Sequence, residues 1–181
     1  MKIIWIDGTY GVGKTSVAFS LKKRLQNCIV YDSDEYWNII ASKDPLAFLW
    51  GGTLPQNKIY FLNNFKDIII DGLHENYLVV VPMTLTMDEC KKYLLDPINH
   101  EVSNDFFHVI LYANKDTVVK RIAKDEWRDC DFTESFFDRN VTYLKQNYPD
   151  AYWIDVESMG IEDIVNIIIN QCNLKDESNN E

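Results

Sequence analysis

Near its start the chain reads Gly8-Thr9-Tyr10-Gly11-Val12-Gly13-Lys14-Thr15, which spells G-x-x-x-x-G-K-T directly after the apolar run Ile3-Ile4-Trp5-Ile6. An apolar helical pattern follows, through Val17, Ala18, Leu21 and Leu25. A strand, a glycine loop and a helix in this order are what a phosphate-binding P-loop requires. The alternative is a chance glycine-rich turn, which the agreement of motif, strand and helix disfavours. We therefore predict that the chain binds a nucleoside triphosphate.

Each residue type in this stretch suits phosphate binding. Glycine allows positive φ, so that successive N–H groups can turn toward one point, and the following helix adds the positive end of its dipole. Lys14 supplies a mobile cation for the β- and γ-phosphates of ATP, and the Thr15 hydroxyl is placed to bind Mg²⁺. The predicted nucleotide-binding residues are Gly8, Thr9, Tyr10, Gly11, Val12, Gly13, Lys14, Thr15 and Ser16.

Length and composition limit the class of protein. The 181 residues are enough for one domain with a substantial core. A net charge of -10 argues against a nucleic-acid partner, because phosphate backbones need clustered Lys and Arg. No apolar run is long enough to span a membrane, and the first strand starts too early for a signal peptide, so we expect a soluble, cytoplasmic protein. The four cysteines are scattered, which indicates neither a zinc site nor a disulfide framework.

The pattern of apolar runs predicts the fold class. Five short runs alternate with helical patterns, at about residues 2–6, 28–31, 77–82, 106–112 and 151–155. This alternation predicts a three-layer α/β/α fold with a parallel five-stranded sheet, for which we expect the kinase-like order 2-3-1-4-5. Residues 1–174 would form a single P-loop domain, and residues 175–181 a polar tail.

Some helix boundaries are open to two readings. Residues 56–75 have helical periodicity, yet residues 67–71 could form a strand; the longer pattern favours a helix that ends at Asn76. A short helix over residues 87–95 should stop at Asp96-Pro97, with a polar connection over residues 99–105. Thr133 is a candidate cap for a helix over residues 133–147.

An acidic cluster lies where an acceptor should sit. Asp32 and Asp34 follow the second predicted strand, and ligands of such sheets bind beyond the carboxyl ends of the strands. A carboxylate there can take the proton of an acceptor hydroxyl as it attacks the γ-phosphate, or hold Mg²⁺ through water. The competing explanation is a solvated turn that caps a helix.

A basic cluster follows the fourth predicted strand. Arg121 and Arg128 are about two helical turns apart and could close over the phosphates, where charge is spread over three oxygens. Arg139 is a weaker candidate. The competing explanation is a surface helix with long basic side chains, which is common in any protein.

Two further groups carry weaker signals. The aromatic residues Tyr36, Trp37, Phe48, Trp50 and Tyr60 gather between the second and third strands, where they could line an acceptor pocket or simply fill the core. The histidines His74, His100 and His108 have no partner nearby in the sequence and are interpreted as structural.

Several stretches together resemble the tunicamycin-resistance protein family, small P-loop ATP-binding proteins related to chloramphenicol phosphotransferase and the nucleoside monophosphate kinases. The resemblance is carried by IIWIDGTYGVGKT, the turn at residues 30–32, LVVVPMTLT and VILYANKDTVVKRI, and it spans about residues 1–170. It implies that residues 8–16 bind ATP with Mg²⁺, that Asp32 and Asp34 face the acceptor, and that Arg121 and Arg128 belong to a lid. One departure is the third strand, which ends in Pro82-Met83-Thr84 where many such kinases have an acidic residue.

Two functions from different classes follow. The first is a small-molecule kinase in which Asp34 or Asp32 is the base and Lys14, Arg121 and Arg128 stabilise the transferred phosphoryl group. The second, suggested by the missing acidic residue after the third strand, is an ATP-dependent protein that sequesters a toxic ligand without modifying it. A regulatory NTPase is a third and weaker reading.

Overall fold

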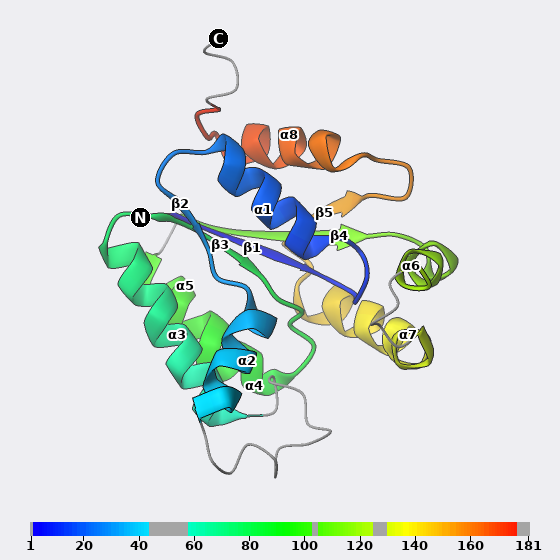
Figure 1. The fold of residues 1–181 in the computed structure, drawn as a ribbon, viewed down its shortest axis with the longest axis horizontal. Helices are drawn as coiled ribbons and strands as arrows, with labels where there is room; N and C mark the ends of the chain where they lie inside the picture. The colour runs from blue at the N-terminus through cyan, green and yellow to red at the C-terminus, as the bar shows by residue number, and fades with distance from the viewer. Residues whose placement is uncertain (1, 44–57, 103–104, 125–129, 177–181) are drawn as a thin grey trace.

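The architecture is a parallel five-stranded sheet with helices on both faces, as Figure 1 shows. The computed structural model describes residues 2–43, 58–102, 105–124 and 130–176. The strands are β1 (Lys2–Gly8), β2 (Cys28–Val30), β3 (Leu78–Pro82), β4 (Phe106–Tyr112) and β5 (Tyr152–Asp155). Their order, β2-β3-β1-β4-β5, and their parallel pairing confirm the predicted fold class.

The helices form the outer two layers. They are α1 (Lys14–Arg24), α2 (Ser33–Lys43), α3 (Ile59–His74), α4 (Asp88–Cys90), the π-helical turn η3 (Lys91–Leu95), α5 (Asp96–Val102), α6 (Lys115–Ile122), α7 (Cys130–Asn147) and α8 (Ile161–Gln171). In Figure 1, α1 and α8 cover one face of the sheet, and α3, α5 and α7 cover the other.

Strand β1 is the centre of the core because both of its faces are covered. Ile4 and Ile6 pack in the cluster formed with α1 and α8, whereas Ile3 and Trp5 pack in the cluster formed with α3 and α5. All four side chains are fully buried. This explains why the strand is continuously apolar rather than alternating, as expected for a parallel sheet.

The ambiguous segment before β3 is a helix. Helix α3 covers Ile59–His74, which confirms the helical interpretation and excludes the strand at residues 67–71. Its apolar side chains recur at helical spacing and are buried, among them Phe61, Phe65 and Ile69. Asn76 then takes the left-handed conformation, with φ of 62°, and turns the chain into β3. The first two residues of the predicted helix, 56 and 57, lie outside the described residues.

The prediction that a helix stops at Asp96-Pro97 is wrong. The chain passes from α4 through the π-helical turn η3 into α5, which runs to Val102, so the expected polar connection over residues 99–102 is helical as well. Pro97 is the second residue of α5, and a missing N–H costs little in the first turn of a helix. Burial of Ile98 and Val102 stabilises the continuation.

The predicted cap at Thr133 is also wrong. Helix α7 starts at Cys130, so Thr133 lies inside its first turns, where its side chain is buried. Helix boundaries are otherwise within a few residues of the predictions, and β1 extends two residues further, to Gly8. In the parts of the chain that the structure describes, no helix is long and apolar enough to cross a membrane.

Candidate functional site

The G-x-x-x-x-G-K-T stretch connects the end of β1 to the first residue of α1, as the motif requires. Gly8, Gly11 and Gly13 have φ values of 135°, 77° and 110°, which confirms the predicted left-handed backbone. The position of Gly8 needs glycine for a second reason, because a Cβ there would lie 2.4 Å from the carbonyl oxygen of Leu111 on β4. The loop is therefore held close against the sheet.

Lys14 lies over the loop in this structure. Its Nζ donates hydrogen bonds to the carbonyl oxygens of Gly8, at 3.0 Å, and Thr9, at 2.9 Å. The same ammonium group is 5.6 Å from the centre of the Tyr10 ring, a cation–π distance. The side chain is half-buried, so the positive charge sits at the mouth of the loop.

Thr15 and Asp32 meet although they are 17 residues apart. The Thr15 hydroxyl donates a hydrogen bond of 3.0 Å to Oδ2 of Asp32, which is 7% exposed. The other oxygen, Oδ1, accepts the backbone N–H of Asp34 at 2.9 Å. Asp32 thus has a fixed position between the first turn of α1 and the first turn of α2. Asp34, Thr15 and Ser16 are exposed to solvent.

Tyr10 lies within the glycine loop. Burial first, and then the negative charge of Asp34, raise the pKa of its hydroxyl to about 12. A carboxylate raises the pKa of a phenol because it disfavours the negative charge of the phenolate. That Asp34 faces an acceptor stays a prediction.

Arg121 joins two loops. One nitrogen of its guanidinium donates to the carbonyl oxygen of Val12, at 3.3 Å, and the other to that of Val156, at 2.9 Å. The contact links the P-loop to the segment after β5. Arg128, the second predicted lid residue, lies outside the described residues, so the role of the pair in a lid stays a prediction. Arg139 is exposed on α7, where its guanidinium lies 5.8 Å from the ring of Phe136.

Glu157 fixes the far side of the same segment. Its carboxylate accepts hydrogen bonds from the Thr117 hydroxyl and from the Asn114 N–H. These two bonds, the Thr117 bond first, lower the pKa of Glu157 below its ordinary value. The segment after β5 is therefore tied both to the start of α6 and, through Arg121, to the P-loop.

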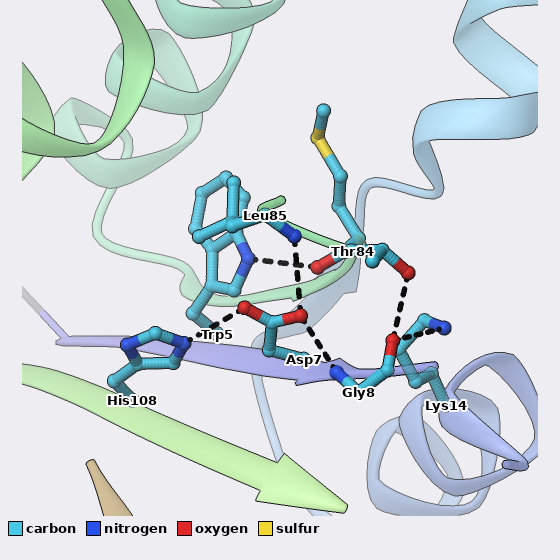
Figure 2. Close-up of polar contacts among 8 residues, drawn as sticks. Trp5, Asp7, Gly8, Lys14, Thr84, Leu85 and His108 are labelled. Carbon is cyan, nitrogen blue, oxygen red and sulfur yellow. Dashed lines mark hydrogen bonds and ion pairs between the residues drawn. The ribbon is translucent and has the colours of Figure 1, made fainter. Parts of the chain in front are cut away.

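A polar cluster that the sequence did not predict lies under the P-loop, as Figure 2 shows. Asp7 is fully buried and is in contact with Gly8, Leu85 and His108. His108, which the sequence indicated to be structural, is thus a partner of a buried carboxylate. The signal in the sequence was Asp7 itself, a charged residue in an otherwise apolar strand, because a buried carboxylate must have polar partners.

The aromatic residues near α2 pack on the core where they are described. The Trp37 ring meets that of Phe61, and the Tyr36 ring meets that of Phe65, each with centroids 5.5 Å apart. Tyr60, in contrast, is 63% exposed. Phe48 and Trp50 lie outside the described residues, and whether this region lines an acceptor pocket stays a prediction.

A preformed metal cluster is not found within residues 2–43, 58–102, 105–124 and 130–176, where no three His, Cys, Asp or Glu side chains gather suitably. The thiols of Cys28, Cys90, Cys130 and Cys172 are free in this structure. Oxygen donors for Mg²⁺ are nevertheless present at the P-loop, where Thr15 and Asp32 are in contact. Magnesium prefers such oxygen ligands and usually keeps several waters besides, so this pair fits the ion.

Comparison with known proteins places the chain among P-loop proteins. A family model described as AAA domain matches residues 4–142. The cytidylate kinase of Thermoplasma volcanium is 25% identical over 171 residues, which cover 90% of this chain and 80% of that protein. The tunicamycin resistance protein of Deinococcus radiodurans has a similar structure, with a TM-score of 0.72, 22% identity and 97% of each chain covered. Shikimate kinase from Bacteroides thetaiotaomicron follows with a TM-score of 0.63 at 16% identity, covering 96% of this chain and 99% of that one. The resemblance predicted from the sequence is thus confirmed at the level of the fold.

Proposed function

The chain belongs to the AAA domain family, and from this premise we propose that it is a small-molecule kinase that transfers the γ-phosphate of ATP to a hydroxyl group of an acceptor. The observation that carries the proposal is the meeting of Thr15 and Asp32 beside Lys14. It places an oxygen pair suited to Mg²⁺ next to a cation suited to phosphates, at the carboxyl edge of a parallel sheet.

We assign the nucleotide to residues 8–16. The amide groups of the glycine loop and the N-terminus of α1 bind the phosphates, and Lys14 leaves the carbonyl oxygens of Gly8 and Thr9 to reach the β- and γ-phosphates. Thr15 and Asp32 hold Mg²⁺, Thr15 directly and Asp32 directly or through water. When bound, the ion neutralises charge on the phosphate oxygens.

Asp34 is our choice for the group that accepts the proton of the acceptor hydroxyl. Asp32 is buried and engaged by Thr15 and by the N–H of Asp34, whereas Asp34 is exposed on the first turn of α2. The two carboxylates therefore have different roles: Asp32 holds Mg²⁺ and Asp34 accepts the proton. Arg121 supports the nucleotide by holding the P-loop and the segment after β5 together, and Arg128 remains a candidate for phosphate contact.

The acceptor class that we favour is a nucleoside-type antibiotic or a related nucleoside or sugar. Support comes from the family resemblance and from kinases with the same fold, whose names include cytidylate kinase and shikimate kinase. The aromatic side chains around α2 suit a flat or partly apolar ligand.

A second function is favoured by one observation. Strand β3 ends at Pro82 and is followed by Met83 and Thr84, so it carries no acidic residue at its end. The carboxylate of Asp7, which accepts the N–H of Leu85 just beyond, is buried rather than open to solvent. A chain with a reduced magnesium site could bind ATP and sequester a toxic ligand without phosphorylating it.

One experiment separates the two functions. The protein is incubated with ATP, Mg²⁺ and a panel of nucleosides, sugars and nucleoside antibiotics, and product masses are measured. A mass gain of one phosphate on a ligand supports the kinase, and Lys14→Ala should abolish the signal. Asp34→Asn should lower kcat about 10²- to 10⁴-fold, the usual contribution of a general base. A stoichiometric ligand complex without product or ADP would instead support sequestration.

A further inference from the structure

Asp7 holds the entrance of the P-loop from beneath. Its Oδ1 accepts two backbone N–H groups, that of Gly8 at 2.6 Å and that of Leu85 at 3.1 Å. Its Oδ2 lies 3.1 Å from Nε2 of His108 on β4. Figure 2 shows the carboxylate between these three partners, which come from β1, from the turn after β3 and from β4. One side chain therefore ties together three segments at the carboxyl edge of the sheet.

The two oxygens of Asp7 have different partners. Because Oδ1 accepts two N–H groups, the contact with Nε2 of His108 is made by Oδ2. His108 thus fixes the free oxygen of Asp7 and with it the rotation of the carboxylate. The imidazole is itself held, since its ring packs edge-on against that of Tyr148 with centroids 4.8 Å apart. Its side chain is 11% exposed, so water competes little for these bonds.

The backbone of Gly8 is consequently fixed on both sides of its Cα, through its N–H and through its carbonyl oxygen. Its N–H is bound by Asp7, and its carbonyl oxygen accepts the Thr84 hydroxyl at 2.8 Å as well as Lys14 Nζ at 3.0 Å. Gly8 also has φ of 135°, a conformation that needs support from its surroundings. Because a P-loop binds phosphate through the direction of successive amides, the orientation of its first peptide sets that of the rest.

We propose that Asp7, oriented by His108, is a positioning residue for nucleotide binding that acts through the Gly8 peptide, an inference that rests on the proposed binding of ATP at this loop. Neither side chain touches the nucleotide. Asp7 fixes the start of the loop and docks the turn at Thr84 and Leu85 against it, so that the loop is preorganised before ATP arrives. The alternative is an ordinary buried pair that contributes to stability alone.

The test compares variants that keep or remove the two acceptor bonds of Oδ1. In Asp7→Asn the amide oxygen still accepts the N–H groups of Gly8 and Leu85, and its NH₂ can donate to the imidazole. We expect Asp7→Asn to keep the ATP Kd within about threefold of wild type, and Asp7→Ala to raise it about tenfold or more, the equivalent of one buried unsatisfied group. Calorimetric titration with Mg²⁺–ATP measures both.

His108 provides a second pair of variants. His108→Leu removes the partner of Oδ2, whereas His108→Gln retains a donor. We expect His108→Leu to raise KM for ATP about fivefold or more with kcat at saturating ATP within about twofold, because a preorganising contact changes binding rather than transfer. His108→Gln should recover most of the loss. This pair keeps the inference testable if Asp7→Ala does not fold.

A control separates positioning from stability. Leu73→Ala removes a fully buried side chain at the C-terminal end of α3 and should lower the urea midpoint of unfolding while leaving the ATP Kd unchanged. If Leu73→Ala weakens ATP binding as much as Asp7→Ala, or if Asp7→Ala and His108→Leu bind ATP like wild type, the positioning role is wrong. In that case the proposed function still stands if the wild-type protein binds ATP and the Lys14→Ala variant does not. Wild-type protein that binds no ATP overturns both.

Discussion

At the scale of single residues, Gly8 is a position where space and backbone conformation both require glycine, and its neighbour is a backbone atom that cannot move aside as a side chain can. An added Cβ would meet the carbonyl oxygen of Leu111 at 2.4 Å, and φ of 135° is unfavourable for any side chain. We predict that Gly8→Ala lowers the free energy of unfolding by about 3 kcal/mol or more, from backbone strain of about 1–3 kcal/mol and a comparable cost of overpacking. Urea unfolding followed by circular dichroism measures the change.

Gly13 is the matched control for this prediction. Its φ of 110° is also positive, but no atom of the described residues lies within 4 Å of the position that a Cβ would occupy. Gly13→Ala should therefore lose only the free energy of backbone strain, about 1–3 kcal/mol, and the variant should remain clearly more stable than Gly8→Ala. Equal losses in the two variants would mean that the contact with Leu111 relaxes freely and contributes nothing.

At the scale of elements, α6 is linked to the P-loop through Arg121. The guanidinium reaches Val12 in the P-loop and Val156 after β5 with separate nitrogens. A lysine has one ammonium group on a flexible stem and cannot reproduce both contacts. We predict that Arg121→Lys raises the Kd for Mg²⁺–ATP about three- to tenfold, the value of one hydrogen bond of about 1 kcal/mol, measured by calorimetry.

Lys120 serves as the control because it is exposed on the same helix. Lys120→Met should leave nucleotide affinity within about twofold of wild type, since a single exposed charge contributes little. If both substitutions weaken binding equally, the effect comes from the general positive charge of α6 rather than from the bridge between the two loops.

The elements also explain which sequence predictions succeed. Helix α3 could be predicted because sixteen residues of consistent periodicity outweigh one short apolar run. The boundary at Pro97 could not, because proline ends a helix or opens one according to its position, and the π-helical turn before it has no sequence signature. The predicted cap at Thr133 is wrong for a similar reason, because a threonine can cap a helix or lie inside one.

At the scale of the whole molecule, the parts of the site that lie in local motifs can be predicted from the sequence, and the parts that depend on pairing between distant strands cannot. The P-loop and Asp32 each follow a strand in the chain, so sheet topology brings them to one edge. The Asp7–His108 contact joins residues 101 positions apart, and the register of β1 against β4 is needed to see it. A buried polar pair across neighbouring strands leaves no spacing pattern in a single sequence.

Three thiols that pack in the core have raised pKa values, which predicts that the free energy of unfolding falls at alkaline pH. Burial raises the pKa of the thiols of Cys28 and Cys172 to about 11 and that of Cys90 to about 12, from 9.0. The folded chain therefore keeps protons that the unfolded chain releases above pH 9. The stability linked to these thiols is fully present below pH 9 and is lost as pH rises toward 11–12, with a slope of up to about 1.4 kcal/mol per pH unit for each group.

The measurement is the urea midpoint between pH 7 and 11 under reducing conditions. We expect a flat profile to about pH 8.5 and a steep fall beyond it. Cys172→Ala removes one of the three groups, so its profile should fall less steeply above pH 9, whatever it loses at pH 7 from its smaller side chain. Tyrosines raised in the same direction, such as Tyr10, join the fall above pH 10. A wild-type midpoint at pH 10.5 equal to that at pH 8 would show that the buried thiols are already accessible in the native state.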